Sequence, residues 1–508
     1  MKYIIAIDVG TSSMRALLYR SDGAIEVSYA YEYHTVFPKP GQVEQNPATW
    51  SRSVRHVLPK IGEYLREHGL KAEGIAVTSQ RSSLIPVDED GVPMYNAIMW
   101  QDKRTLEQCE VLHKEYGLKE LYRKTGLRIN PYFVLPKIMW VRKNMPGIYQ
   151  TAHKFIGVQD YVVYLLTNEF VTDWSQACRT MLMNIETFQW DEELMAIAGI
   201  TADRLPKLVA PGSVAGGLCS EMAALTGLPE GLPVVVSGGD QQNAAVGLGV
   251  VRPGMAEANT GTGSFVIAYA DKPIFDEECR VLCQASAIAG KWVIEAGIFN
   301  TGAIYRWFKE QFCMDIIGRD SPYERMNAEA EAAGAGAHGV MMLPHFEGSA
   351  APYWNPEAKG MFFNLSLGTK RADCFRAILE GISMEIADNL RLIRKAVGDL
   401  TEVSAAGGMT VSDLFCRIQA SCYELPVTRR ENAEASSLGA VVVAAAALGL
   451  YESTEAACEG MLPPASDTFV PDEKDVPVYR KLSAAKQVLY RALNESDTYP
   501  TFMNLFEE

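Results

Sequence analysis

A short glycine loop rich in hydroxyl side chains occurs twice in the sequence, and its residue types suit phosphate binding. The two copies span residues 8–15 and 259–264, and their hydroxyl residues include Thr11, Ser12, Ser13 and Thr262. Glycine lets backbone N–H groups approach an anion without a Cβ clash, and the hydroxyl groups add further donors. Two such loops in one chain predict a nucleotide that is held by its phosphates between two domains.

The residues around the first loop predict strands on both sides of it. Residues 3–7 form a continuous apolar run, residues 14–19 are mostly apolar, and residues 25–33 alternate after an Asp22-Gly23 turn. The glycine loops of the P-loop and dinucleotide folds lead into a helix instead. The sequence therefore predicts a strand meander that differs from both of those nucleotide-binding folds.

Asp240 is the candidate for a proton acceptor. It follows a buried strand predicted at residues 233–236 and the pair Gly238-Gly239, at the start of a predicted helix whose N-terminus favours an ionised carboxylate. An ionised Asp beside a phosphate site can take the proton of a hydroxyl group, which is the task of the base in phosphoryl transfer. A structural N-cap is the alternative. The glycine pair and the second loop shortly after it favour the catalytic role.

Further residues are candidates for the nucleotide side. Asp8 precedes the first loop and could orient waters on a Mg²⁺ ion between two phosphates, or it could be a turn residue at a strand end. Arg15 could pair with a phosphate or with an acidic neighbour. Gly407-Gly408, between a predicted strand and a predicted helix, would let a planar base approach the backbone, although a tight helix-entry turn has the same pattern.

The candidates for the acceptor side include polar residues at the end of a buried strand. Residues 74–78 predict this strand, and the polar residues 79–83 follow it. The carboxyl end of a buried strand is well placed for a ligand. Arg81 there, and Tyr132 in a later loop, could form hydrogen bonds with substrate hydroxyl groups. Either residue viewed alone would also suit an ordinary surface position.

Length and composition predict an ordered protein of two domains. The 508 residues exceed the ~250–300 residues of a single core, so we expect one domain at 1–250 and another at 251–508 with a helical tail at 454–508. Hydrophobic residues are 48% and charged residues 21% of the chain, as in globular proteins. The net charge of −15 argues against nucleic acid as a partner.

We expect the chain to be cytoplasmic. Lys2 is followed at once by a strand pattern rather than by a signal peptide. The longest apolar run, residues 435–450, is interrupted by serine and glycine and is shorter than the ~20 residues of a membrane span. The ten cysteines are scattered and expected to be reduced, and their spacing and that of the seven histidines predict no metal site.

Taken together, the motifs resemble the FGGY family of carbohydrate kinases, which belongs to the actin-like ATPase superfamily. Residues 132–144 are similar to the family's first signature, residues 360–380 to its second, and residues 351–356 to the segment before the second. The resemblance spans nearly the whole chain. It implies an α/β fold of two ribonuclease-H-like domains, with mixed sheets flanked by helices and an active site in the cleft between the domains.

The resemblance also implies roles for individual residues. It implies ATP and Mg²⁺ as cofactors, and Asp240 as the base. The residues implied to contact the phosphates are Thr11, Ser12, Ser13, Arg15 and Thr262. The residues implied to contact other parts of the nucleotide are Gly302, Arg306, Gly407, Gly408 and Ser412. Ser412 departs from the pattern, because glycerol kinases carry there an Asn that contacts adenine.

Within the family, the local likeness is to glycerol kinases. The residues that match their pattern, and are implied to bind the substrate, are Gln80, Arg81, Tyr132, Asp240 and Gln241. Ser82, also expected at the substrate, breaks the pattern, because glycerol kinases carry there a Glu that accepts hydrogen bonds from glycerol. Loss of that acceptor is costly if a buried hydroxyl group is left unpaired. We therefore expect a different or larger substrate.

The leading hypothesis is an ATP- and magnesium-dependent kinase that phosphorylates a hydroxyl group of a small sugar, ketose or polyol. A true glycerol kinase with a substituted site is one alternative. Another is a non-catalytic, nucleotide-gated sugar-binding or regulatory protein of the same fold, and Asp240 argues against it because such a protein needs no hydroxyl base. We expect no nucleic-acid and no membrane partner, and a homodimer is one assembly to test.

Overall fold

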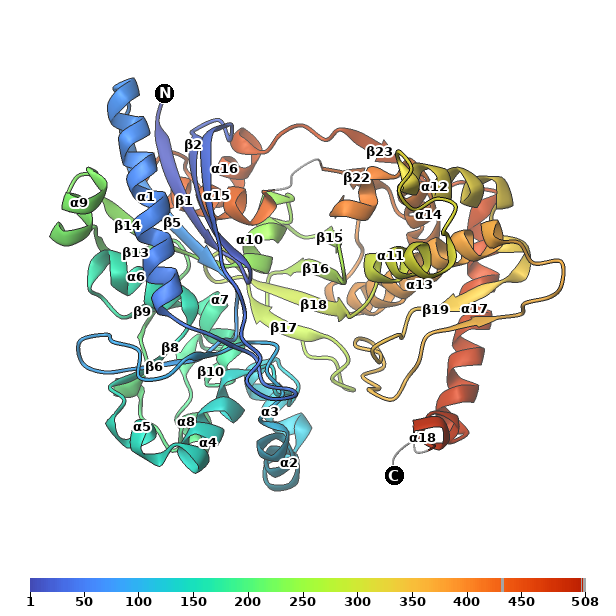
Figure 1. Cartoon of the computed structure of the whole chain (residues 1–508), viewed down its shortest axis with the longest axis horizontal. Helices are drawn as coiled ribbons and strands as arrows, with labels where there is room; N and C mark the ends of the chain where they lie inside the picture. The colour runs from blue at the N-terminus through green and yellow to red at the C-terminus, as the bar shows by residue number, and fades with distance from the viewer. Residues whose placement is uncertain (431–433, 504, 506–508) are drawn as a thin grey trace.

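Two large mixed sheets, each flanked by helices, make up most of the molecule, which confirms the predicted α/β class (Figure 1). The computed structural model describes residues 1–430, 434–503 and 505. We call the part built on the first sheet the first lobe and the part built on the second sheet the second lobe.

The first sheet has six strands in the order β13-β14-β5-β1-β2-β3. Their bounds are β1 Tyr3–Val9, β2 Ser13–Arg20, β3 Ile25–Glu32, β5 Ala72–Ser79, β13 Ser213–Gly217 and β14 Pro233–Gly239. β1, β2 and β3 form the predicted antiparallel meander, and β5 and β14 lie parallel to β1. The four central strands β14, β5, β1 and β2 are mostly apolar and buried because helices cover both faces, whereas the edge strands β13 and β3 are partly exposed.

The second sheet has seven strands in the order β17-β18-β16-β15-β21-β22-β23. Their bounds are β15 Met255–Thr260, β16 Ser264–Ala270, β17 Leu282–Ala285, β18 Trp292–Ile298, β21 Glu402–Ala406, β22 Val427–Arg429 and β23 Asp467–Phe469. β15, β16 and β18 repeat the meander of the first sheet, and β21 and β22 lie parallel to β15. The two copies of the glycine loop therefore occupy the same turn in two sheets of like topology.

Helices from both halves of the chain cover the first sheet. α1 Ala48–His68, α6 Val158–Thr167 and α9 Ser220–Thr226 pack on one face. α10 Asp240–Gly247 and α15 Ala435–Ala447 pack on the other, joined by α16 Thr454–Met461, although α15 and α16 lie between β22 and β23 of the second sheet in sequence (Figure 1). α10 and α15 approach closely, since a Cβ on Gly439 would lie 1.8 Å from the carbonyl oxygen of Asn243.

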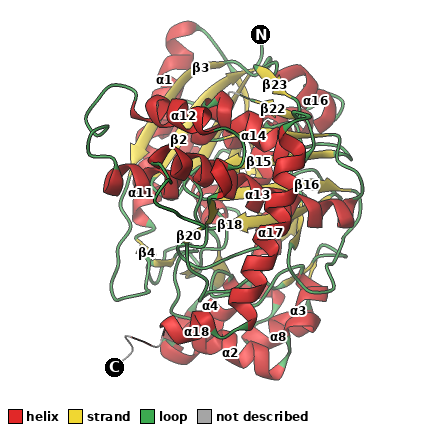
Figure 2. Ribbon diagram, turned by 90° about the vertical axis from the view of Figure 1, so that its right-hand side faces the viewer, coloured by secondary structure: helices red, strands yellow, loops and turns green. Residues whose placement is uncertain are grey.

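α13 Arg371–Val397 covers the face of the second sheet that lies away from α10 and α15. Three further helices surround α13: α11 Gly302–Phe312, α12 Pro322–Ala333 and α14 Asp413–Tyr423. The tail helix α17 Asp475–Glu495 crosses the outside of this layer (Figure 2). Its buried Lys486 donates hydrogen bonds to Glu385 and Asp388 of α13. The tail is therefore fixed to the second lobe by buried ion pairs.

A smaller helical region lies below the first sheet in the view of Figure 1 and has its own apolar cluster. Its main helices are α2 Leu106–Glu115, α3 Leu118–Thr125, α4 Val134–Asn144, α5 Pro146–Thr151 and α8 Glu192–Ala198. The helical pattern of residues 106–121 is divided between α2 and α3. Gly117 interrupts it with φ 78°, a left-handed conformation that ends one helix and reorients the next.

All ten cysteines are free thiols, as predicted. Within the described part of the chain, no helix combines the length and the apolar character needed to cross a membrane.

Candidate active site

Three parallel strands of the first sheet end side by side, and the candidate catalytic residues follow them. Val9 of β1 is opposite Ser79 of β5, and Ser79 is opposite Gly239 of β14. Because their carboxyl ends meet at one edge, the sheet gathers Asp8, the segment after Ser79 and Asp240 in one place. β14 continues through the predicted glycine break, and Gly238 reaches φ 118° just before α10 begins at Asp240.

Asp240 lies at this edge with its carboxylate held on two sides. Its Oδ1 accepts a hydrogen bond from the backbone N–H of Gln241 at 2.7 Å and faces Nε of Arg81 at 3.4 Å. Burial raises the pKa of the Asp240 carboxyl, and the charge of Arg81 opposes the rise. Asp240 is the first residue of α10 and Gly239 is the N-cap, so Asp240 does not occupy the N-cap position of the alternative interpretation.

Arg81 and a second arginine, Arg179, form a buried charge network beneath Asp240. Nη1 of Arg81 donates to Glu295 Oε2 at 3.0 Å, and Nη1 of Arg179 donates to Glu295 Oε1 at 3.2 Å. Nη1 of Arg81 also contacts the amide oxygens of Gln242 and Gln284. Glu295 and Gln284 belong to the second lobe, so this network joins the two lobes beneath the cleft.

The predicted substrate residues Ser82 and Tyr132 meet at Arg179. Nε of Arg179 donates to Ser82 Oγ at 3.3 Å, and its guanidinium lies 4.7 Å from the centre of the Tyr132 ring. Ser82 has φ 69°, and buried Lys137 donates through Nζ to the backbone oxygens of Ser82 at 2.6 Å and Tyr132 at 2.8 Å. Lys137 thus fixes the backbone of both residues, and burial lowers its pKa to about 7.

The first glycine loop is hydrogen-bonded to the acceptor side. The hydroxyl of Thr11 donates to Gln80 Oε1 at 3.4 Å and accepts from Trp100 Nε1 at 3.2 Å. Nε2 of Gln80 donates to the backbone oxygen of Gly10 at 3.2 Å. The Trp100 ring lies 5.2 Å from that of Tyr132. The Thr11 side chain, predicted to contact phosphate, is thereby also tied to the substrate residues.

A cavity of about 720 Å³ opens between the lobes next to this edge. Of the residues predicted to bind nucleotide or metal, Asp8, Arg15, Gly407 and Gly408 line it. The other lining residues are Asn259, Ala406, Thr410, Val411, Asp413, Arg429, Arg430, Glu434, Ala435 and Ser436. The cavity is large enough for a nucleotide, and both lobes contribute to its wall.

The second glycine loop packs against two other predicted nucleotide residues. The backbone N–H of Gly302 donates to the Gly261 oxygen at 3.0 Å, and a Cβ on Gly302 would lie 2.4 Å from that oxygen. Gly407 has φ 97°, and a Cβ there would lie 2.4 Å from the oxygen of Thr260. Only glycine fits either position, so the loop, the start of α11 and the Gly407 turn form one corner of the second lobe.

Asp8 and Arg15 are the charged residues that the first lobe contributes to the cavity. Arg15 forms an ion pair with Glu434, an acidic neighbour from the second half of the chain. Burial raises the pKa of Asp8 to about 7, the charges of Asp240 and Glu434 add to the rise, and Arg15 opposes it. Crowded carboxylates of this kind fit a hard cation such as Mg²⁺. Among the described residues, no cluster of three or more His, Cys, Asp or Glu side chains could hold a metal alone.

Other predicted residues stand apart from the cavity wall. Ser12, Thr262 and Arg306 are exposed. Ser13 begins β2, and the hydroxyl of Ser412 accepts from the backbone N–H of Phe415 at 3.3 Å as the N-cap of α14. The amide oxygen of Gln241 is buried and has no hydrogen-bond partner within the described chain, next to the candidate base.

Sequence reasoning assigned no role to Glu295, Gln284 or Glu434. Glu295 and Gln284 lie inside strands that read as ordinary sheet, and the only signal for Glu295 was a charged residue within the buried strand β18. Arg179 also received no role. A buried charge requires a partner, so Glu295 could have been flagged, but not paired, from sequence.

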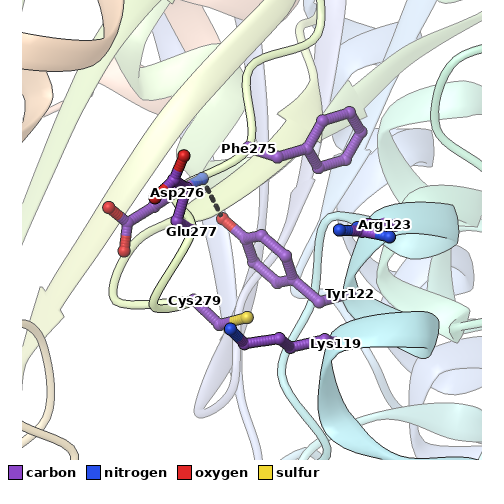
Figure 3. Close-up of a pocket in the computed structure, with 7 residues that line it drawn as sticks. All are labelled: Lys119, Tyr122, Arg123, Phe275, Asp276, Glu277 and Cys279. Atoms are coloured by element: carbon purple, nitrogen blue, oxygen red, sulfur yellow. Dashed lines mark hydrogen bonds between the residues drawn. The ribbon is translucent and has the colours of Figure 1, made fainter.

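A second, smaller cavity of about 240 Å³ lies where α3 meets the loop before β17 (Figure 3). The Tyr122 hydroxyl points into this contact, accepts from the backbone N–H of Asp276 at 3.1 Å and donates to the Val281 oxygen at 2.7 Å. This cavity shares no residue with the larger one. The Tyr122 hydroxyl thereby joins α3 to the second lobe at this cavity.

Fold and site together form two sheet-based lobes, with a cavity of about 720 Å³ walled by both and a buried polar network that joins them. The model of the N-terminal domain of the FGGY family of carbohydrate kinases matches residues 3–247, and that of the C-terminal domain matches residues 256–448. The chain belongs to the FGGY family of carbohydrate kinases. It is therefore an enzyme that phosphorylates a sugar or polyol with ATP.

The similar proteins are named as kinases of different substrates. A glycerol kinase of Thermococcus gammatolerans is 35% identical over 461 residues, which cover 89% of this chain and 91% of that protein. A gluconokinase of Bacillus licheniformis is 31% identical over 504 residues, covering 98% and 97%. Among solved structures, a ligand-bound xylulose kinase from Lactobacillus acidophilus has a TM-score of 0.92 at 25% identity, covering 99% of this chain and 100% of that one.

Proposed function

We propose that Asp240 is the general base of this kinase and that the acceptor hydroxyl group binds between Asp240 and the Arg81–Arg179 pair. The acceptor oxygen forms a bond to the γ-phosphorus of ATP, the bond from that phosphorus to the β–γ bridging oxygen breaks, and ADP leaves. Asp240 Oδ takes the hydroxyl proton. The carrying observation is that Asp240 lies at the strand edge beside both Arg81, at 3.4 Å, and the cavity residue Asp8, whose pKa it raises.

The acceptor site consists of Gln80, Arg81, Ser82, Tyr132, Asp240 and Gln241. Arg81 donates hydrogen bonds, and its charge favours the ionised form of Asp240, which partly offsets the rise in pKa that burial causes. The amide oxygen of Gln241 is free to accept a substrate hydroxyl. Trp100 and Tyr132 supply an apolar wall beside these polar groups. A polyhydroxy substrate needs this combination of donors, acceptors and a ring face.

The nucleotide occupies the 720 Å³ cavity. Its adenosine lies against the Gly407-Gly408 turn near Ser412 and Arg306, and its phosphates reach toward the two glycine loops. Thr11, Ser12, Ser13, Thr262 and the start of α11 at Gly302 are the groups that can donate to them. Arg15 exchanges its ion pair with Glu434 for the phosphates. Asp8 holds Mg²⁺, which when bound neutralises phosphate charge.

Several classes of substrate are candidates for the acceptor. A glycerol kinase is the second candidate, favoured by the Gln80-Arg81 pair and by the glycerol kinase relatives. Ser82 favours a larger substrate, since its short side chain leaves the space of a glutamate and leaves Arg179 Nε with a neutral partner. The gluconokinase relatives make sugar acids a further class to test.

We also propose that the chain works as a cytoplasmic homodimer, with one domain at 1–250 and one at 251–508.

A panel of acceptors tests this function. ADP release is measured with ATP and Mg²⁺ in the presence of glycerol, longer polyols, ketopentoses, ketohexoses and sugar acids. We expect one class to raise the rate at least about 100-fold over water as acceptor, the scale on which a positioned base acts. A flat response across the whole panel would contradict the proposed acceptor site.

A further inference from the structure

Glu295 crosses from the second lobe to the acceptor site. It lies on β18 in register with Ile267 of β16, and Ile267 is in register with Glu257 of β15. This row is on the face of the second sheet that packs against α10 and α15 of the first lobe, since Ile267 belongs to their apolar cluster. Glu295 therefore projects toward the first lobe.

The carboxylate of Glu295 engages both arginines of the acceptor site at once. One oxygen accepts from Arg81 at 3.0 Å and the other from Arg179 at 3.2 Å. Arg81, Arg179 and Glu295 are only 2%, 3% and 3% exposed. Burial alone raises the pKa of Glu295, but the charges of the two arginines outweigh it and hold the pKa below its usual value. The group is an ionised buried carboxylate shared by two cations.

Each arginine also contacts a residue of the proposed catalytic or acceptor site. Arg81 reaches Asp240 through Nε, and Arg179 reaches Ser82 through Nε and lies over Tyr132. A planar guanidinium that is held on one edge presents its other edge in a fixed direction. The orientation of both donors in the first lobe therefore depends on one carboxylate in the second lobe.

We propose that Glu295 is a positioning residue that aims Arg81 at the base Asp240 and Arg179 at the acceptor pocket, so that the acceptor site is complete only when both lobes are in contact. The inference rests on the proposed function. It adds that acceptor binding and the relative placement of the lobes are one event. It also explains why charged groups are retained in a buried interface, where removal of one partner is normally costly.

Glu257 provides the matched contrast. It lies in the same row and is 0% exposed, and neither of its carboxyl oxygens has a hydrogen-bond partner in the described structure. Burial, with the charge of Glu295 adding to it, raises the pKa of Glu257 well above its usual value. This shift favours the neutral form of Glu257, and glutamine is close to that form in both shape and charge. Glu257→Gln controls for substitution in the same buried row.

The experiment compares Glu295→Gln, Glu257→Gln and the native chain with the acceptor that stimulates ADP release. A glutamine at 295 accepts through one atom and donates through the other, so it can hold only one arginine. We expect kcat to fall about 10–100-fold, the scale of a misplaced reactive group, and the acceptor KM to rise. ATP affinity and acceptor-free ATP hydrolysis should stay within about twofold of native, since they do not need the aligned base.

Several outcomes separate the claims. A Glu295→Gln enzyme that matches Glu257→Gln in every constant overturns the positioning role and leaves the kinase function standing. Equal losses in acceptor-free hydrolysis and ATP affinity would also overturn it, because they indicate a general structural defect. A native chain with no acceptor response contradicts the proposed function and this inference with it.

If Glu295→Gln does not fold, Glu295→Asp decides the question. It keeps the charge but shortens the reach by one methylene, so two arginines cannot both be held at 3.0 and 3.2 Å. We expect a fall in kcat of about tenfold with unchanged ATP affinity. A native kcat in this variant would contradict the proposal.

Discussion

The nucleotide side and the acceptor side of the cleft are built from different parts of the chain. The proposed nucleotide cavity of about 720 Å³ combines the Gly407-Gly408 turn, where the backbone approaches closely, with charged side chains that include Arg15 and Arg429. The acceptor side is made of buried side chains that bond to each other across the lobes, such as Arg81, Arg179 and Glu295. The glycine turn constrains the shape of the nucleotide side, whereas a network of side chains can be retuned for different acceptors. Specificity therefore belongs to the acceptor side.

The largest expected effect is on the acceptor side. Asp240→Asn removes the proton acceptor but keeps the size of the side chain. We expect kcat to fall by about 10²–10⁴, the usual contribution of a general base, with the ATP dissociation constant within about twofold of native. Steady-state ADP release and equilibrium ATP titration measure the two quantities. A parallel loss of ATP binding would show that the two sides are not separable in this way.

The next effect is on the nucleotide side. Gly407→Ala adds a Cβ at φ 97°, 2.4 Å from the Thr260 oxygen, so the turn must move. We expect ATP affinity to fall about tenfold or more, corresponding to the 1–3 kcal/mol of a strained backbone residue. Gly398→Ala is the control, since Gly398 has φ 91° with no atom within 4 Å of an added Cβ. Equal ATP affinities in both variants would refute the role of the Gly407 turn.

Ser82→Glu tests whether residue 82 on the acceptor side sets the substrate preference. The new carboxylate would face Arg179, whose Nε lies 3.3 Å from Ser82 Oγ, and would fill space that a larger substrate uses. We expect the ratio of kcat/KM for glycerol to that for the native substrate to rise about tenfold, with ATP kinetics unchanged. Substrate competition assays measure the ratio. An unchanged preference would count against placing residue 82 at the substrate.

The smallest effect is in the pH profile. Burial raises the pKa of Asp240 and Arg81 only partly offsets it, so the carboxyl begins to protonate at a higher pH than an exposed Asp does. Because the base must be ionised, kcat/KM should fall as the pH drops through this raised pKa and be constant above it. Asp240→Asn should lack this limb. A limb at the pKa of an ordinary exposed aspartate would contradict the buried setting of the base.

The contrast between the two sides also explains what sequence could predict. The meander of β1, β2 and β3, the start of α10 at Asp240 and the helix at Gly302–Phe312 follow from local apolar runs and glycine positions. The Gly407 turn is visible for the same reason. These features depend on neighbours in sequence, and the nucleotide side is built mainly from them.

The acceptor network depends on contacts that local pattern does not encode. Glu295 and Arg81 are 214 residues apart, and Glu295 and Arg179 are 116 apart. α15 lies within the longest apolar run of the sequence, but its packing with α10 against the first sheet depends on the tertiary approach of Gly439 to Asn243. The break at Gly117 was missed because apolar periodicity continues on both sides of it. Local periodicity predicted elements, and only the assembled fold pairs them.

The most direct test of the account follows the γ-phosphoryl group. ATP labelled on its γ-phosphate is incubated with the native chain, Mg²⁺ and the acceptor identified in the panel, and the label is separated into phosphorylated acceptor and inorganic phosphate. The account predicts that the label moves to the acceptor, with little inorganic phosphate, because the buried network presents a hydroxyl group to Asp240. Label released only as inorganic phosphate, with or without acceptor, would contradict the transfer of phosphate between the two sides of the cleft.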